Sequence, residues 1–394
     1  MSPLSTHKEL NYLRGLFFLF GFLIMSWIPR FPEVKAALSL TNGQFGSLIS
    51  TGAVGSFVAL LTVGHVVHKF GVKVVLQIAA LSLSITLIIL ASTHSSFIFF
   101  CANLVFGAAI SAFHISINSQ AFNLQDRLGR FIITQLSGLW SAGALIAAVI
   151  AGLLVDRIPL YLHVAVLAIL VLLIMITLIQ LLTGSLITAN DDPEIEYKLK
   201  DLFRDLNFDA VISIGLICAI FLEFVIGDWA AIYTNEEVGI SGGLNTLPYI
   251  LFTISMIFGR LTVHHLLPRF SIEKLVKIAS LSAGSAFLVS IVIARAIEDS
   301  HKGMALIVVS IGFTLAGLGS SFLGPTFMNA ANVRSKHPAS VVIGHIGVAN
   351  IVLTFALKWI LAWTAQATSL TIALLIPGLM LLAVPLFAKA VKRV

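Results

Sequence analysis

Residues 158–182 read IPLYLHVAVLAILVLLIMITLIQLL and contain no charged side chain. About 20 apolar residues in a helix are enough to cross the roughly 30 Å hydrocarbon core of a bilayer. The chain has twelve apolar stretches of this kind, at residues 13–31, 44–67, 73–93, 96–122, 131–154, 158–182, 209–234, 244–263, 274–294, 303–327, 338–361 and 367–388. The sequence therefore predicts an all-α membrane protein with twelve transmembrane helices.

The composition of the whole chain agrees with this prediction. Of its 394 residues, 58% are hydrophobic and only 11% are charged, whereas soluble domains are about a quarter charged. The net charge is +6, but the basic residues lie in short segments between apolar runs, where membrane orientation explains them better than nucleic acid. The two cysteines, Cys101 and Cys218, both lie in apolar runs, so we expect neither a disulfide framework nor a cysteine-rich metal site.

The longest polar interval divides the twelve stretches into two groups of six. We predict an N-terminal bundle over residues 1–182, a linker over 183–208 and a C-terminal bundle over 209–394. Most of the 24 Lys and Arg residues fall on the side that holds both termini and the linker. Because basic residues in short loops prefer the cytoplasm, we expect both termini and the linker to be cytoplasmic.

The two halves carry a faint internal repeat. Residues 21–27, GFLIMSW, and residues 223–229, EFVIGDW, share Phe, Ile and Trp at the same offsets. A second match pairs residues 64–71, GHVVHKFG, with residues 259–270, GRLTVHHLLPRF. In a membrane protein, such a repeat is typical of a transporter built from paired bundles. We therefore predict two pseudo-symmetric six-helix bundles.

These features resemble the major facilitator superfamily over essentially the whole chain. That family has the pattern Gly-x-x-x-Asp-Arg-x-Gly-Arg in the loop after its second helix. The matching positions here are Gly64, His68, Lys69, Gly71 and Lys73, and the second-half counterparts are Gly259 and His264. Histidine replaces the acid in both halves, which puts the family's acid-to-helix latch in doubt, although a neutral histidine could form a hydrogen bond there.

Within the superfamily, the chain most resembles the bacterial inner-membrane branch related to fucose permease. The residues that carry this resemblance are Trp27 to Arg30, Asn118 to Ala121, Asp126, Arg127, Arg130, Glu223, Asp228 and Trp229. His114 stands where that branch usually has an aspartate. The Gly-Pro signature of antiporters is missing between Gly138 and Gly152, which lowers a drug-efflux interpretation without excluding it.

A few ionisable side chains fall inside the apolar stretches, where each costs about 2.5–3.5 kcal/mol without a partner or a wet cavity. The resemblance puts Arg30 and Asp228 at similar depth on facing helices, so we predict that they form a gate. The alternatives are a permanent structural pair, or an Arg30 that snorkels to the interface. Glu223 points about 140° away from Asp228 and has apolar neighbours, so we predict that it carries a proton; it could instead lock its helix to a neighbour.

Polar residues at helical spacing suggest a solute site. Asn103, His114 and Asn118 fall within about 60° on one helix face, which indicates a wet wall, and His114 could bind solute, take the proton, or be a satisfied core residue. The full set of predicted solute-binding residues is Trp27, Arg30, Asn103, His114, Asn118, Trp140, Ser321, Asn329, Asn350 and Lys358.

The sequence contains no enzyme signature, no phosphate-binding loop and no paired metal ligands at helical spacing, so we expect no enzymatic activity, cofactor or metal. We predict a secondary active transporter that works as a monomer in the bacterial inner membrane. Its partners would be the bilayer, protons and a small polar solute such as a sugar, a sugar acid or a zwitterion. Proton-coupled import is favoured by the resemblance; the alternatives are an exporter of a metabolite or toxic compound, and a non-transporting receptor or scaffold.

Overall fold

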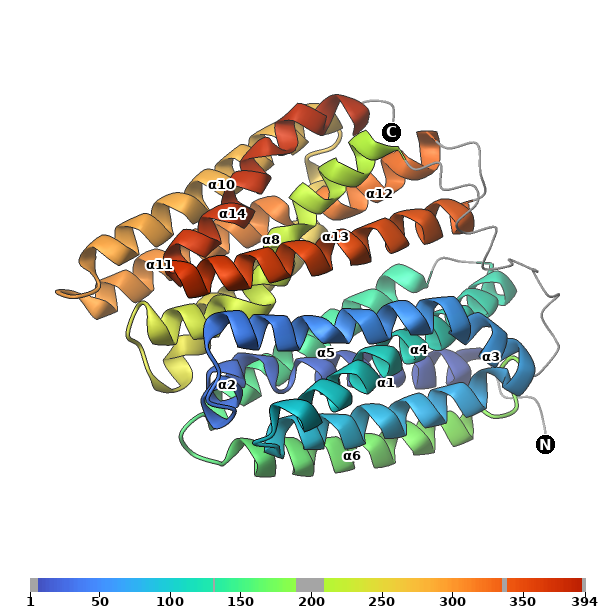
Figure 1. The fold of residues 1–394 in the computed structure, drawn as a ribbon. Helices are drawn as coiled ribbons and strands as arrows, with labels where there is room; N and C mark the ends of the chain where they lie inside the picture. The colour runs from blue at the N-terminus through green and yellow to red at the C-terminus, as the bar shows by residue number, and fades with distance from the viewer. Residues whose placement is uncertain (1–5, 130–131, 189–208, 335–338, 392–394) are drawn as a thin grey trace. The chain divides into compact units, whose positions relative to one another are not determined.

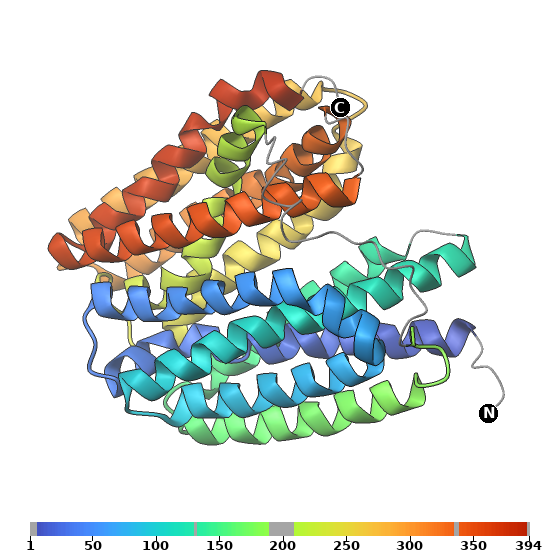
Figure 2. The ribbon, with the colours of Figure 1, turned by 45° about the vertical axis from the view of Figure 1, so that its right-hand side comes forward.

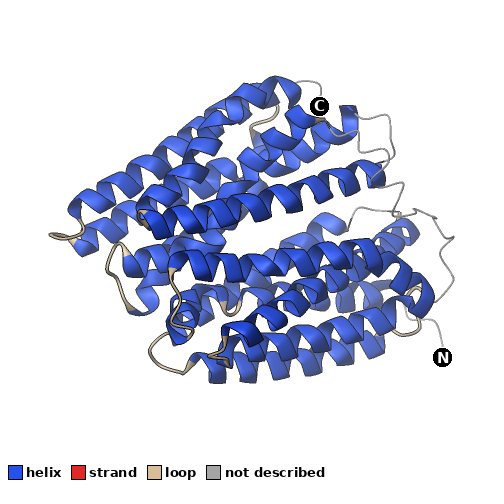
Figure 3. Cartoon of the chain, viewed as in Figure 1, coloured by secondary structure: helices blue, strands red, loops and turns tan. Residues whose placement is uncertain are grey.

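A computed structural model describes residues 6–129, 132–188, 209–334 and 339–391. In these residues every regular element is a helix and none is a strand (Figures 1 and 3). Ten helical segments of the described residues are long and apolar enough to cross a membrane. The prediction of an all-helical, multi-pass membrane protein is therefore confirmed.

The ten segments differ from the twelve predicted stretches for two local reasons. The stretches 44–67 and 73–93 lie in one 51-residue helix, α3 (Asn42–Ser92), which contains a break at Gly71. The stretch 338–361 falls in α13 (Ala339–Ala367), which is not among the ten. The helix boundaries otherwise follow the apolar runs closely.

The chain forms two compact units. Unit 1 contains Met1–Ile28, Glu33–Ser39 and Leu48–Glu196, and unit 2 contains Pro29–Pro32, Leu40–Ser47 and Tyr197–Val394. Two short pieces of the N-terminal half, residues 29–32 and 40–47, thus group with unit 2. A single division at residues 183–208 does not predict that these two pieces group with unit 2. The division of the chain into two six-helix bundles stays a prediction.

Unit 1 is built around α1. Its helices are α1 (Thr6–Met25), the greater part of α2 (Phe31–Ala37) and of α3, α4 (Ser96–Leu128), α5 (Ile133–Leu154) and α6 (Leu160–Leu181). The short η1 (Ile28–Arg30) lies between α1 and α2, and its residues are divided between the two units. Helix α1 packs against α4, α5 and α6, and lies along α5 in both ribbon views (Figures 1 and 2). Large apolar side chains such as Phe97 and Leu173 remain exposed on the outside of the unit, as expected for helices that face lipid.

Small residues let the helices of unit 1 approach closely. A Cβ atom on Gly107 of α4 would lie 1.9 Å from the carbonyl oxygen of Gly52 in α3, so only glycine fits there. At the same crossing, the Ser56 hydroxyl donates a hydrogen bond to the Gly107 carbonyl at 2.9 Å. Close backbone contact through small residues is a usual way for membrane helices to associate.

The break in α3 also depends on a glycine. Gly71 has φ 78° and ψ 160°, a conformation that residues with a Cβ rarely adopt. The helix axis changes direction there, between the two predicted apolar stretches. Gly71 belongs to the predicted loop motif, so the motif residue acts here by setting the backbone.

Unit 2 is built around α8 (Ala210–Glu236). The other elements of its C-terminal portion are η2 (Gly242–Thr246), α9 (Leu247–Thr262), η3 (Val263–His265), α10 (Ile272–Ile297), α11 (Lys302–Ser320), α12 (Leu323–Arg334), α13, α14 (Leu370–Ala383) and η4 (Val384–Val391). Helix α8 packs against α9, α12, α13 and α14. It is therefore the helix that contacts most of its bundle.

Polar side chains fix both ends of α8. Asp209 caps its first turn by accepting hydrogen bonds from the backbone N–H groups of Val211 and Ile212 at 3.1 and 3.2 Å. Just after its last turn, the Glu237 carboxylate accepts from the Leu370 N–H at 2.8 Å and the Thr371 hydroxyl at 2.9 Å. Glu237 thereby joins the end of α8 to the start of α14.

The predicted stretch 303–327 is interrupted. Helix α11 ends at Ser320, α12 begins at Leu323, and Pro325 lies in the first turn of α12, where its missing N–H costs no helical hydrogen bond. The break leaves the backbone carbonyl of Ser321 available to a side chain.

Candidate functional site

Two carboxylates of α8 form ion pairs with cations from two different helices. Glu223 Oε2 lies 3.2 Å from Arg260 Nη2 of α9, and Asp228 Oδ2 lies 2.7 Å from Lys358 Nζ of α13. The side chains of the first pair are 38% and 37% exposed, and those of the second are 16% and 20% exposed. We call these four residues the α8 charge face, although Glu223 and Asp228 project from α8 about 140° apart. Each of its two ion pairs is neutral and partly exposed.

Arg260 connects the charge face to the helix break. Its Nη2 donates to both Glu223 oxygens at 3.3 and 3.2 Å, while its Nε donates to the carbonyl oxygen of Ser321 at 3.0 Å. The Ser321 hydroxyl donates to the Leu318 carbonyl at 2.7 Å. One guanidinium therefore bridges α8, α9 and the junction of α11 with α12.

An aromatic side chain flanks the second pair. Lys358 Nζ lies 5.4 Å from the ring centre of Phe224, within the range of a cation–π contact. Flat apolar surface thus lies beside displaceable charges, a combination suited to a polar solute that has a ring or an apolar face.

The partner of Asp228 differs from the one expected. The sequence predicted a gate between Arg30 and Asp228, whereas the structure pairs Asp228 with Lys358. Arg30 belongs to η1, is 1% exposed, and groups with unit 2. It is not snorkelling to a surface, and a gating role for Arg30 and Asp228 stays a prediction.

Two further predicted residues of unit 2 take no part in the two ion pairs. Asn329 is exposed on α12, and Asn350 is half-buried on α13. The Oδ1 atom of Asn350 is buried and has no hydrogen-bond partner in the described part of the chain. That atom is an acceptor that a bound group could satisfy.

In unit 1, Asn103 ties two helices together. Its Nδ2 lies 3.0 Å from each of three acceptors in α3: the carbonyls of Leu48 and Ile49 and the hydroxyl of Thr51. The side chain is buried. Asn103 and Gly107, one turn further along α4, therefore both face α3. Solute contact at Asn103 stays a prediction.

The other two residues of the stripe on α4, His114 and Asn118, are more exposed than Asn103. His114 has an exposed side chain whose ring stacks on Phe20 at 6.2 Å between centroids. Asn118 donates to the backbone carbonyl of His114 at 2.8 Å, within its own helix. His114 is thus the member of the stripe that is placed to meet a solute or a proton.

The two predicted tryptophans serve helix packing in unit 1. Trp27 is buried and packs edge-on against Phe106 at 5.9 Å, with Phe99 at 6.3 Å. Trp140 is half-buried on α5, and its carbonyl oxygen faces Gly21, where a Cβ atom would lie only 2.1 Å away. Stacking of either ring on a solute stays a prediction.

The described geometry is that of a helical membrane protein with charged pairs in its spanning helices, and comparison with known proteins identifies the family. The family model for the Major Facilitator Superfamily matches residues 15–356. The chain belongs to the Major Facilitator Superfamily. It is accordingly a transport protein of the membrane and not an enzyme, as the sequence predicted.

Two similar proteins match most of this chain. An uncharacterised MFS-type transporter of Yersinia pestis is 28% identical over 386 residues, covering 96% of this chain and 95% of that protein. The membrane protein MosC of Rhizobium meliloti is 24% identical over 340 residues, covering 83% and 76% of the two chains. Neither name specifies a solute.

Solved structures share the fold at low sequence identity. A mutant of the nucleoside transporter NupG has a TM-score of 0.77 at 15% identity, covering 97% of this chain and 99% of its own. The D-xylose-proton symporter has a TM-score of 0.68 at 15% identity, covering 98% and 97%. These matches establish the MFS fold.

The MFS loop motif is spread over several local structures. Lys69 Nζ lies 5.3 Å from the Phe70 ring, and Gly64 has open space where a Cβ would be. Gly259 packs against Ser321. His264 lies in η3 with its ring 3.8 Å from that of His265. His68 and Lys73 lie on either side of the break at Gly71.

Sequence reasoning missed Arg260 as a site residue. It lies inside the predicted apolar stretch 244–263, yet its charge was assigned to the adjoining basic loop. The rule that singled out Glu223, a charge at membrane depth, applied equally to Arg260.

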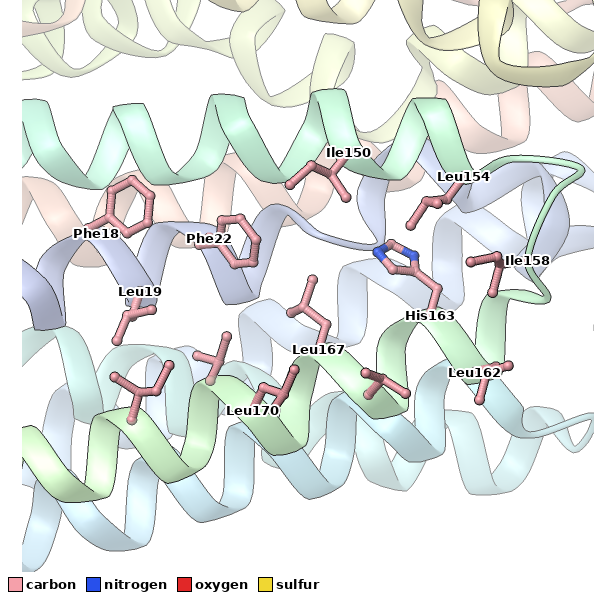
Figure 4. Close-up of a pocket in the computed structure, with 13 residues that line it drawn as sticks. Phe18, Leu19, Phe22, Ile150, Leu154, Ile158, Leu162, His163, Leu167 and Leu170 are labelled. Atoms are coloured by element: carbon pink, nitrogen blue, oxygen red, sulfur yellow. The ribbon is translucent and has the colours of Figure 1, made fainter.

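A cavity in unit 1 differs from the α8 charge face because its lining is almost entirely apolar. It has a volume of about 590 Å³ and lies between α1, α5 and α6, with lining residues that include Phe18, Phe22, Leu167 and Leu170 (Figure 4). His163 is the one polar side chain that lines it. Such an apolar lining suits hydrocarbon and offers little to a polar solute, so we place the candidate site at the α8 charge face.

The beginning of α3 packs within unit 2 beside this face. Trp363 Nε1 donates to the Ser47 hydroxyl at 3.1 Å, and Phe45 meets Trp229 edge-on at 6.3 Å between centroids. A Cβ on Gly46 would lie 2.3 Å from the Cβ of Ala362. Trp229, which follows Asp228 directly, is thereby fixed in a tight apolar contact.

Proposed function

We propose that this MFS protein is a secondary active transporter that imports a small polar solute together with protons by alternating access. The observation that carries the proposal is the α8 charge face: two carboxylates of one spanning helix, each paired with a cation from a different neighbour. Ionisable groups at membrane depth are costly and generally mark solute or proton pathways. Two structural neighbours, a nucleoside transporter and a D-xylose-proton symporter, support a solute of this size and polarity.

Glu223 is the proton carrier in this proposal. Protonation would remove the charge that holds Arg260 Nη2, while the bond from Arg260 Nε to the Ser321 carbonyl does not depend on that charge. The guanidinium would then reorient about the helix break between α11 and α12. A proton on one helix can in this way alter the junction of two others.

Asp228 and Lys358 are the solute-binding pair in this proposal. Their ion pair is the less exposed of the two, so a solute group that replaces either partner gains a strong, poorly screened interaction. Phe224, beneath the ammonium, would support the apolar face of a ring. A sugar, a sugar acid or a zwitterion can satisfy such a site.

The remaining predictions fit the same scheme. Within unit 1, His114 would bind solute or take a proton, and Arg30 with Asp228 would form the gate. The linker and both termini would lie in the cytoplasm of a bacterial cell, with the protein a monomer in the inner membrane. These assignments are supported by the distribution of basic residues and by the family.

The test is uptake into proteoliposomes under an inward proton gradient, with uridine, D-xylose, gluconate and betaine as labelled probes. We expect at least one probe to accumulate, and collapse of the gradient to abolish accumulation. In Glu223→Gln, exchange of that probe across the membrane should continue while uphill accumulation is lost. Glu273→Gln is the matched control, because Glu273 forms an ion pair with Lys277 within α10 and away from the charge face.

Two results would contradict the proposal. If no probe accumulates although the protein binds one of them, transport by this site is wrong. If Glu223→Gln accumulates the probe as well as the native protein does, the proton is carried elsewhere, and His114→Gln becomes the variant to compare.

A further inference from the structure

Gln120 of α4 connects three parts of unit 1 through one side chain. Its Nε2 donates to the Ser185 carbonyl at 2.7 Å and to Glu9 Oε1 at 2.9 Å, and its Oε1 accepts from the Ile187 N–H at 3.0 Å. The side chain is completely buried. Residues 185 and 187 lie in the segment that follows α6.

Glu9 of α1 completes the polar group. Its Oε1 also accepts from Arg127 Nη2 at 2.5 Å. The Glu9 side chain has no exposed surface, whereas the Arg127 side chain is 41% exposed. The fully buried carboxylate of Glu9 is therefore paired with a guanidinium, that of Arg127, which is exposed to solvent.

The same segment closes the break in α3. The Val72 N–H donates to the Ile187 carbonyl at 3.1 Å. Because Gly71 is not helical, the chain there cannot continue the regular ladder, and Ile187 provides the acceptor that a backbone N–H needs. Ile187 thus bonds α4 through its N–H and α3 through its carbonyl.

We infer that Glu9, Gln120, Arg127, Val72, Ser185 and Ile187 form a clasp that opens and closes as one unit. A single planar amide makes three of its hydrogen bonds, so rotating Gln120 to break one of them misaligns the others. When closed, the clasp fixes the point where the chain leaves α6 and the angle at Gly71.

One atom indicates that the closed state is not fully satisfied. Glu9 Oε2 is buried and has no hydrogen-bond partner in the described residues. An unpaired buried oxygen carries a desolvation cost that is recovered when water reaches it. Opening the clasp hydrates this oxygen, which lowers the cost of losing the other bonds.

The clasp connects the break at Gly71 in α3 to α4 by hydrogen bonds that do not require an acid at position 68. The MFS loop pattern has an acid there, but this chain has His68. The tie here runs from the backbone of Val72 through Ile187 to Gln120. It is independent of the identity of the transported solute.

Hydrogen–deuterium exchange of the full-length protein in lipid nanodiscs tests the inference, read on peptides that cover residues 70–74 and 183–188. In the native protein we expect both peptides to exchange with one common opening rate, faster than the core of α5. In Gln120→Ala both should exchange about tenfold faster, which corresponds to about 1.4 kcal/mol. Glu9→Gln keeps the shape of the side chain. It should accelerate exchange less than Gln120→Ala does, and by the same factor in both peptides.

Gln135→Ala is the matched control, because it removes an amide that accepts from Arg14 at 2.9 Å in the same unit but outside the clasp. We expect it to leave both peptides unchanged. The inference is overturned if the two peptides respond separately, if they exchange only with the core of α5, or if neither clasp variant changes them. Should Gln120→Ala fail to fold, Glu9→Gln decides by the same criteria.

Discussion

Helix α8 of unit 2 and helix α4 of unit 1 both carry polar residues at membrane depth, but they use them differently. In α8, Glu223 and Asp228 form ion pairs with side chains of α9 and α13. In α4, Asn103 bonds to two backbone carbonyls and a hydroxyl of α3. An ion pair can be broken by a proton or a competing charge, whereas an amide bonded to backbone has no such trigger.

The comparison assigns different duties to the two regions. Where the repeat places Glu223 and Asp228, the first half has Gly21 and Ser26, neither of which is an acid or a base. In the proposed scheme, Glu223 and Asp228 of α8 respond to protons and solute, while the α3–α4 crossing supplies rigidity. Substitutions at the crossing should change stability, and substitutions on α8 should change transport.

The largest effect is expected at the α3–α4 crossing. Gly107→Ala places a Cβ 1.9 Å from the Gly52 carbonyl, so the helices must separate, and we expect a loss of about 3 kcal/mol of stability. Gly138→Ala on α5 is the control, since no atom lies within 4 Å of its Cβ position and helix propensity favours alanine. Thermal unfolding in detergent should separate the two, and equal midpoints would break the comparison.

A smaller loss of stability, with complete loss of transport, is expected at the second ion pair. Lys358→Met leaves Asp228 without its cation and should cost about 2 kcal/mol, less than a fully buried pair because both side chains retain some exposure. Adding Asp228→Asn should restore the unfolding midpoint but not uptake. Recovered uptake in the double variant would show that the pair only holds α8 to α13.

Asn103 sharpens the comparison from the other side. Asn103→Leu removes its hydrogen bonds to α3 and should cost about 1 kcal/mol, while the KM of the transported probe stays unchanged. Uptake kinetics and unfolding midpoints are measured on the same preparation. A raised KM with an unchanged midpoint would instead place Asn103 in the solute site.

The smallest effect on stability is expected for the most exposed pair. Glu223→Gln should change the free energy of unfolding by less than about 0.5 kcal/mol, because both side chains of the Glu223–Arg260 pair are more than a third exposed. Proton-driven accumulation should nevertheless be lost. A large drop in the unfolding midpoint would mean that Glu223 locks α8 in place, the structural alternative.

Apolar runs were sufficient to predict the helices, because the length needed to cross a bilayer is set by the bilayer. The run 158–182 became α6 with a shift of at most two residues at either end. The break in α3 at Gly71 lies between the predicted stretches 44–67 and 73–93, but the hydrogen bond from Val72 to the distant Ile187 could not be predicted.

The candidate site was predictable in its residues but not in its pairings. Sequence identified Glu223, Asp228 and Lys358 as costly charges, yet no periodicity distinguishes Lys358 from Arg30 as the partner of Asp228. The pairing depends on how α13 packs against α8. For the same reason, the stripe on α4 could not reveal that Asn103 meets α3 backbone and not water.

The bond from Arg260 to the carbonyl of Ser321 has a genetic consequence. Every amino acid has a backbone carbonyl, so Ser321→Ala keeps the acceptor. Every replacement of Arg260 removes the Nε–H donor. A saturation screen for uptake should therefore tolerate small residues at position 321 and reject even lysine at position 260.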